Sequence, residues 1–327
     1  MISAEHLTKY YGDFAAVRDL TFTIEDGHVY GFLGPNGAGK STTMNIMTGC
    51  LSATSGRVTI DGHDIFEEPK EAKKQIGYLP EQPPLYLTET PEEYLRFVGE
   101  AKGLKKAELA DQIETVLLQT GTAGVRNRRI GELSKGYRQR VGIAQALLGN
   151  PRVIILDEPT VGLDPIQILE IRDLIRELGK NHTVLFSSHI LSEVQAICDR
   201  ILILSHGRLI AMGDAESLEQ TLLTPGEISL IADSGTEETR AVLAPLAGNG
   251  LLSENGMPPY SLSPQEDGRT RAVLKLTRDQ NADDLCRALF FAFSGAGIAL
   301  LELTPKKASL EDIFLELTED RKEESVS

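Results

Sequence analysis

The sequence predicts an α/β protein of two domains, and three features of its 327 residues support that prediction. Short apolar runs typical of buried strands alternate with segments of helical periodicity, which indicates a largely parallel sheet. One apolar run leads directly into a glycine-rich loop. The composition also changes near residue 215, because the 112 residues that follow carry 20 acidic and only 10 basic side chains. We therefore expect domains at 1–215 and 216–327.

In the first domain, strands are expected over the apolar runs 20–27, 29–34 and 56–62. Residues 90–118 have apolar side chains at three- and four-residue spacing, which predicts helices, and a helical subdomain is expected at about 85–150. The expected elements that follow are a buried strand at 153–157, a helix at 168–178, a strand at 183–188 and a hairpin at 201–214 that turns at His206-Gly207.

The second domain is expected to be a small α+β unit. The pattern predicts strands at 227–233, 271–277 and 298–304, and helices at 237–246, 282–293 and 309–317. One more strand near Leu251 or Ser261 would give the order βαββαβ, the split arrangement of ferredoxin-like domains. We expect an accessory domain, regulatory or dimerising, that ends in a disordered charged tail at 319–327.

Composition excludes several classes of protein. The net charge of −15 and the pI near 4.9 disfavour a nucleic-acid binder. The three cysteines lie far apart, which argues against disulfides or a zinc site and favours a reducing compartment. The longest uncharged apolar run, 288–301, has 14 residues, fewer than the ~20 that span a bilayer, and the first residues lack the form of a signal peptide. The pattern indicates a soluble chain that would need a partner to hold it at a membrane.

Residues 34–41 read GPNGAGKS and match the phosphate-loop pattern GxxxxGK[ST], after an apolar strand and before a helix-compatible run. Such a loop curls its backbone N–H groups around phosphate oxygens, and the helix N-terminus adds its positive dipole. Lys40 would reach the β- and γ-phosphates, and Ser41 would coordinate Mg²⁺. The residues expected to bind ATP here are Gly34, Pro35, Asn36, Gly37, Ala38, Gly39, Lys40, Ser41 and Thr42.

The strand at 153–157 ends in two adjacent carboxylates, Asp157 and Glu158. Because side chains alternate along a strand, the two cannot do the same work. Asp157 would lie on or beside Mg²⁺, whereas Glu158 would orient the attacking water at the γ-phosphate. Alone, such a pair is more often a turn or a helix cap, but together with the phosphate loop it favours a P-loop NTPase.

With these motifs present, residues 1–215 resemble the nucleotide-binding subunit of an ATP-binding cassette (ABC) transporter. Residues 132–141, ELSKGYRQRV, resemble the LSGGQ signature, in which Ser134 and Gly136 match while Lys135 and Tyr137 depart. The resemblance implies that this segment caps the γ-phosphate of ATP bound by the other subunit of a dimer. A basic stretch around it, from Arg126 to Arg140, is read either as a solvated helix end or as a guide for phosphate.

The resemblance also assigns roles outside these motifs. GLDP at 162–165 resembles the D-loop, which implies that Asp164 crosses the dimer interface. SSHI at 187–190 places His189 at the γ-phosphate. Tyr11 stands where an aromatic side chain stacks on adenine, with Tyr10 as the alternative. The family's Q-loop glutamine would follow YLP, but here Glu81 fills that position and Gln82 comes next, so both are candidates for the Mg²⁺ contact.

The segment 308–318 resembles the end of bacterial exporter-type cassettes of the drug-efflux and gliding-motility groups. The resemblance implies a chain that binds and hydrolyses ATP, dimerises around two ATP molecules and drives a separate transmembrane permease subunit at the cytoplasmic face of the inner (plasma) membrane. The alternative is a soluble ABC-type ATPase that acts on ribosomes or DNA. The single phosphate loop and the acidic charge disfavour it, and the intact catalytic motifs disfavour a non-hydrolysing module.

Overall fold

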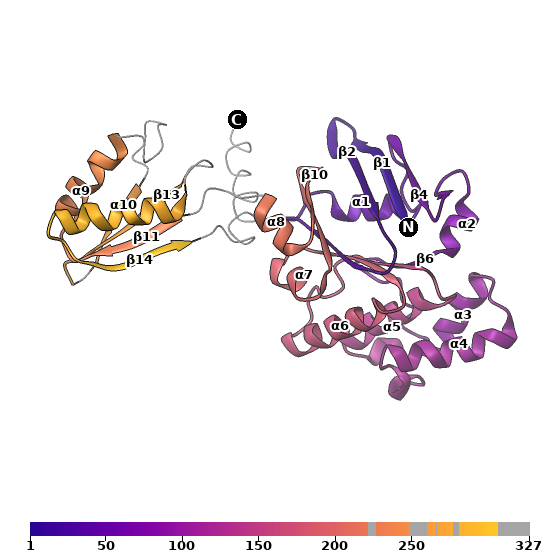
Figure 1. Cartoon of the computed structure of the whole chain (residues 1–327). Coiled ribbons are helices and arrows are strands. Elements are labelled where there is room, and N and C mark those ends of the chain that lie inside the picture. The colour runs from indigo at the N-terminus through magenta and orange to yellow at the C-terminus, as the bar shows by residue number, and fades with distance from the viewer. Residues whose placement is uncertain (222–226, 249–259, 266, 277–280, 307–327) are drawn as a thin grey trace. The chain divides into compact units, whose positions relative to one another are not determined.

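The computed structural model describes residues 1–221, 227–248, 260–265, 267–276 and 281–306. The chain divides into two compact units, Met1–Ala215 and Glu216–Ser327 (Figure 1). The helix predicted at 309–317, the charged tail at 319–327 and Leu251, one of the two candidate positions for an extra strand, lie outside the described residues. In the part of the chain that is described, no helix has both the length and the hydropathy needed to cross a bilayer.

The first unit is built on a six-stranded sheet in the order β10-β9-β3-β8-β7-β6. Its strands are β3 (Val29–Leu33), β6 (Ile76–Leu79), β7 (Val153–Leu156), β8 (Thr183–Ser188), β9 (Arg200–Ser205) and β10 (Arg208–Gly213). Five of them run parallel and β10 runs antiparallel to β9, which confirms the largely parallel sheet. The predicted hairpin is also confirmed: His206 and Gly207 both have positive φ, as a tight hairpin turn requires.

An antiparallel sheet in the order β2-β1-β4-β5 lies at the start of the chain. Its strands are β1 (Ile2–Tyr11), β2 (Phe14–Ile24), β4 (Ser55–Ile60) and β5 (His63–Asp64). The strand predicted at 20–27 begins six residues earlier, at Phe14, and ends at Ile24 because Asp26 and Gly27 form a turn. β1 was not predicted as a strand, since register irregularities break its polar–apolar alternation.

The helices of the first unit are α1 (Lys40–Met47), α2 (Pro69–Lys74), α3 (Pro91–Ala101), α4 (Lys106–Gln119), α5 (Lys135–Leu147), α6 (Pro165–Leu178) and α7 (Leu191–Ile197), with short 3₁₀ turns η1 (Ala123–Val125) and η2 (Ile130–Glu132). Helices α3, α4 and α5 pack on one another as a group (Figure 1). α3 begins with a capping box between Thr90 and Glu93. The helical pattern of 90–118 divides in two because Gly103 turns the chain with a left-handed φ of 79°.

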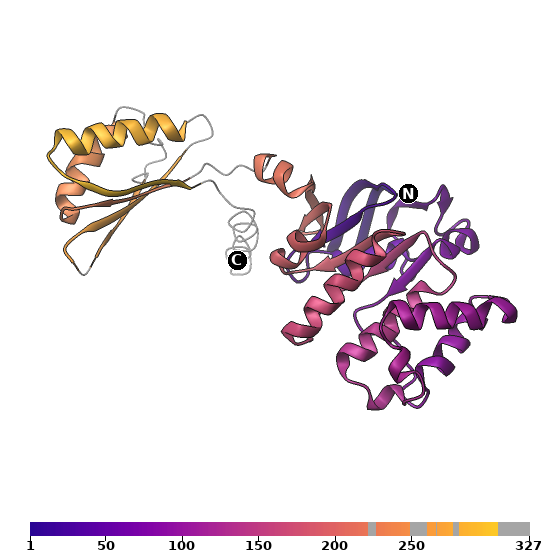
Figure 2. The same ribbon diagram turned by 60° about the horizontal axis from the view of Figure 1, so that its bottom comes forward.

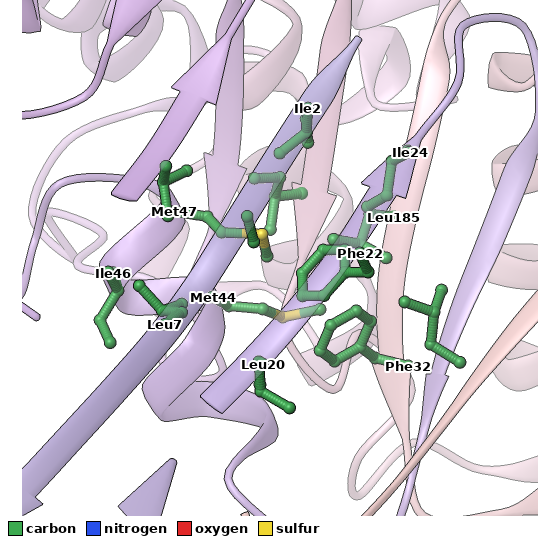
Figure 3. Packing of buried hydrophobic residues seen from close by; sticks show 14 of the residues in the cluster. Ile2, Leu7, Leu20, Phe22, Ile24, Phe32, Met44, Ile46, Met47 and Leu185 are labelled. Atoms are coloured by element: carbon green, nitrogen blue, oxygen red, sulfur yellow. The ribbon is translucent and has the colours of Figure 1, made fainter. Parts of the chain in front are cut away.

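One hydrophobic core joins the antiparallel sheet, the mixed sheet and α1. Figure 3 shows Phe22 of the antiparallel sheet beside Phe32 of the mixed sheet, and Leu7 of the antiparallel sheet near Met44 of α1. The Phe22 and Phe32 rings meet edge to face, with centroids 5.5 Å apart. This packing fixes α1, and with it the loop that precedes the helix.

The second unit has an antiparallel sheet in the order β12-β13-β11-β14. Its elements are α8 (Ala215–Thr221), β11 (Glu227–Ala232), α9 (Thr236–Gly248), β12 (Tyr260–Pro264), β13 (Thr270–Lys275), α10 (Ala282–Gly295) and β14 (Leu300–Lys306). Helices α9 and α10 cover one face of the sheet (Figures 1 and 2), with a core that includes Leu230, Leu274 and Phe293. The extra strand contains Ser261, so the βαββαβ order and the ferredoxin-like strand arrangement are confirmed.

Candidate functional site

The glycine-rich loop joins the end of β3 to the start of α1. Gly37 and Gly39 have left-handed φ values of 78° and 100°, which side-chain-bearing residues rarely adopt. A Cβ on Gly39 would also lie 2.6 Å from the carbonyl oxygen of Ala16. Glycine is therefore required where the loop enters the helix, and the tight curl points the N-terminus of α1 at the space in front of the loop.

Lys40 is the first residue of α1, and its side chain is only 5% exposed. Its Nζ donates to the carbonyl oxygens of Gly34, at 2.7 Å, and Pro35, at 3.3 Å. It also lies 3.3 Å from Oε1 of Glu158. The positive charge of Lys40 is thus held against the backbone of the glycine-rich loop, next to the carboxylate of Glu158, which follows β7.

Glu158 follows β7, and its side chain is 8% exposed. Its second carboxylate oxygen, Oε2, lies 3.0 Å from Nδ1 of His189. The backbone adopts a left-handed φ of 47°, unusual for glutamate, and the N–H donates to Oγ of Ser187 at 2.8 Å. A strained residue held this firmly is characteristic of functional sites. The structure therefore brings the predicted Lys40, Glu158 and His189 together.

Asp157 lies one residue earlier, and two hydroxyl groups donate to its Oδ1: Ser41 at 3.1 Å and Ser187 at 2.7 Å. Burial raises the pKa of Asp157, while these two hydrogen bonds act in the opposite direction. Adjacent hydroxyl and carboxylate oxygens are the hard ligands that Mg²⁺ uses when it arrives with a phosphate. Among the described residues, no three His, Cys, Asp or Glu side chains gather into a metal site.

An open cleft of about 430 Å³ lies in front of the loop. It is lined by Tyr11, Phe14, Ala16, Asn36, Gly37, Gly39, Lys40, Ser41, Thr42, Glu81, Glu158, Val161 and His189. Of the two candidates for stacking on adenine, Tyr11 lines this cleft and Tyr10 does not. Of the two Q-loop candidates, Glu81 lines it and Gln82 does not. Phe14, 62% exposed, was missed by sequence reasoning although it belongs to the KYYGDF segment.

A second cleft, with no lining residue in common with the first, gathers the signature segment. Its lining is Gly121, Ser134, Gly136, Tyr137, Arg140, Asp164, Ile166, Gln167 and Glu170. Ser134 caps the N-terminus of α5 and accepts from the Tyr137 N–H at 3.4 Å, while Asp164 caps α6 and accepts from the Gln167 N–H at 2.9 Å. The structure thus brings Ser134, Gly136 and Asp164 together, away from Lys40.

Three arginines of the basic stretch bind other groups of the chain. Arg126 forms ion pairs with Glu92 and Glu114, and Arg138 donates to three backbone carbonyls. Arg140 pairs with Glu170 at 2.8 Å while lining the second cleft. These contacts favour a structural role for Arg126 and Arg138 over the alternative that they guide phosphate.

In this site a strand and a glycine loop lead into a helix that begins with a buried lysine, and two adjacent carboxylates lie beside it. That arrangement defines a P-loop NTPase. The family model described as "ABC transporter" matches residues 17–161. The chain is 35% identical to the bacitracin transport ATP-binding protein BcrA of Bacillus licheniformis, over 97% of each chain. It is 33% identical to the linearmycin resistance ATP-binding protein LnrL of Bacillus subtilis, over 97% of this chain and 98% of that one. The chain belongs to the ABC transporter ATP-binding proteins.

A solved structure supports the same conclusion. The dimeric ATP-binding cassette MJ0796, in a post-hydrolysis state bound to ADP and Pi, is 27% identical, with a TM-score of 0.59 over 65% of this chain and 98% of that one. The predicted fold and function are therefore confirmed: the chain is the ATP-binding and ATP-hydrolysing subunit of an ABC transporter. Cassettes of this family bind nucleotide, dimerise and work with transmembrane permeases, and the ribosome or DNA alternative is not favoured.

Proposed function

We propose that the first cleft binds ATP with Mg²⁺ and hydrolyses it. Lys40 and the loop N–H groups bind the β- and γ-phosphates, Tyr11 stacks on adenine, and Ser41 and Asp157 hold Mg²⁺, with Glu81 the better placed of the two Q-loop candidates. When bound, Mg²⁺ neutralises phosphate charge.

One observation carries this proposal: the buried Glu158 carboxylate bridges Lys40, at 3.3 Å, and His189, at 3.0 Å. When ATP binds, the phosphate can replace the Glu158 carboxylate as the partner of Lys40. The freed carboxylate can then accept a proton from a water molecule beside it. His189 then keeps the same carboxylate oriented at the γ-phosphate end of the cleft.

We propose that a second copy completes each site. Ser134 and Gly136 lie at the N-terminus of α5, with the donors that a terminal phosphate needs, but they line a different cleft from Lys40. A head-to-tail dimer would place the second cleft of one copy over the first cleft of the other, with Asp164 at the interface. The dimeric MJ0796 cassette supports this arrangement.

The subunit is proposed to energise a separate exporter-type permease at the cytoplasmic face of the inner membrane. Support comes from relatives whose names state bacitracin transport and linearmycin resistance. The 216–327 unit is proposed to be an accessory, regulatory or dimerising domain, with its own hydrophobic core. A pull-down of the tagged chain from detergent-solubilised membranes tests the partner: a multi-span protein in near-equal amount supports the proposal, and ribosomal or nucleic-acid material alone contradicts it.

The catalytic assignment is tested with Glu158→Gln. Glutamine keeps the size of the side chain but cannot take a proton from water, so we expect ATP turnover to fall by about 10² to 10⁴. Nucleotide binding should persist, and size-exclusion chromatography with ATP should show a stable dimer, because hydrolysis no longer opens it.

Glu177→Gln is the matched control, since Glu177 is an exposed residue of α6 that pairs only with Lys180 in the described structure. It should hydrolyse ATP at the wild-type rate and show no trapped dimer. Undiminished turnover in Glu158→Gln would overturn the role of Glu158.

A further inference from the structure

Glu193, on α7, is a buried carboxylate that the proposed hydrolysis does not use. The residue is 2% exposed, and its Oε2 accepts two hydrogen bonds, from Oγ1 of Thr160 at 2.8 Å and from Oγ of Ser188 at 2.9 Å. Burying a carboxylate is costly unless its oxygens are satisfied, so these contacts are strong ones.

The two donors lie next to the two catalytic side chains: Thr160 is in the turn that follows Glu158, and Ser188 is the last residue of β8. Thr160 is two residues after Glu158, and a tight turn joins them through the Val161 N–H, which donates to the Glu158 carbonyl at 3.2 Å. Ser188 immediately precedes His189, and its Oγ also accepts from the Ile190 N–H at 3.0 Å. The Ser188 hydroxyl, which donates to Glu193, therefore fixes the backbone on both sides of His189.

Glu193 also reaches the helix that Asp164 caps. Its Oε1 lies 3.8 Å from Nη2 of Arg172 on α6, too far for a hydrogen bond. Nε of Arg172 is buried, and within the described residues it has no hydrogen-bond partner. This third contact is looser than the other two, so a small displacement of α6 can tighten it while the hydroxyl contacts remain.

We infer that Glu193 is a positioning residue for ATP hydrolysis, which sets Glu158 and His189 in register with each other and links both to the Asp164 end of α6. This inference rests on the proposed function. Within the described residues, the side-chain partners of Glu193 are Thr160, Ser188 and Arg172, none of which belongs to the phosphate loop. Losing these contacts should therefore impair turnover and leave ATP binding intact.

The test uses Thr160→Val, which removes the hydroxyl at nearly constant volume, and Thr160→Ser, which retains it. We expect turnover at saturating ATP to fall about tenfold or more in Thr160→Val, since small misplacements of catalytic groups are costly, with the KM for ATP changed by less than about twofold. Thr160→Ser should recover most of the loss. Glu193→Gln, which puts an amide against Arg172, should show the same division between kcat and KM.

A merely structural role is distinguished by a double-variant cycle. In a His189→Ala background, Thr160→Val should lower turnover by less than about a further twofold, because the register between Glu158 and His189 matters only when both side chains are present. The inference is overturned if Thr160→Val and Glu193→Gln turn over ATP at the wild-type rate, if their losses persist in full beside His189→Ala, or if KM rises in step with lower thermal stability. Glu158→Gln is assayed in parallel: if it remains active, the proposed function itself fails, whereas an inactive Glu158→Gln beside a fully active Thr160→Val removes only this inference.

Discussion

At the scale of single residues, the carboxylate of Asp157 is buried in the folded chain. Burial raises its pKa in the folded chain above that in the unfolded chain. The stability that the folded chain has below the ordinary pKa of aspartate is therefore lost as pH rises through the raised value. We expect nucleotide-free Asp157→Asn to be more stable than wild type at neutral pH, because asparagine avoids the cost of a buried charge and retains the acceptor for Ser41 and Ser187.

Urea unfolding at several pH values measures this difference. The advantage of the asparagine variant should shrink as pH falls and vanish below about 4, where wild-type Asp157 becomes protonated in the unfolded as well as the folded state. An advantage that stays constant with pH would contradict the assignment to ionisation, and a less stable variant would show that the carboxylate is a net stabilising group.

Sequence motifs predicted the residues of the site, but not the side chains whose hydrogen bonds fix the positions of those residues. Lys40, Glu158 and His189 could be named because each belongs to a short pattern at a strand end. Ser187, which contacts both Asp157 and the Glu158 backbone, was missed as a site residue because its partners are about thirty positions away. The pairing of β7 with β8 creates those contacts, and sequence spacing does not contain it.

At the scale of elements, β6 lies against α5 with no room for a side chain at Gly77. A Cβ there would overlap the carbonyl oxygen of Ala146 on α5, and a backbone obstacle cannot rotate away. We expect Gly77→Ala to lower the free energy of unfolding by about 1 to 3 kcal/mol, the usual cost of overpacking. Gly124→Ala is the matched control, since a Cβ there meets nothing within 4 Å and its φ is not left-handed.

Denaturant unfolding of both variants compares them directly. A change of less than about 0.5 kcal/mol in Gly77→Ala would mean that β6 and α5 can separate without cost. Element ends were harder to predict than elements: residues 90–118 were expected to be helical, but their division into α3 and α4 depends on the turn at Gly103.

At the scale of the whole molecule, composition and strand order predicted two different units. The shift in acidic content after residue 215 and five of the six elements of the βαββαβ order come from local sequence, so they could be predicted directly. The sequence could not predict which segment forms the fourth strand of the second unit, because β12 is short and has exposed and half-buried positions only. Pairing with β13 selects Tyr260–Pro264 for that role.

The separate cores of the two units predict separate unfolding. One core joins both sheets of the first unit with α1, and the other lies between the second unit's sheet and its helices. We expect calorimetry of the full chain to show two transitions. Mg-ATP at about a hundred times its Kd should stabilise only the unit that contains Lys40, by about 2.7 kcal/mol.

Lys40→Ala supplies the control for this experiment. It removes the cation that the loop holds beside Glu158, so it should keep both transitions and lose most of the ATP-dependent shift. A shift of equal size in both transitions would show that the units unfold as one body and would contradict their independence. A full shift in Lys40→Ala would instead show that the nucleotide binds elsewhere, because a ligand stabilises only the unit whose folded form it recognises.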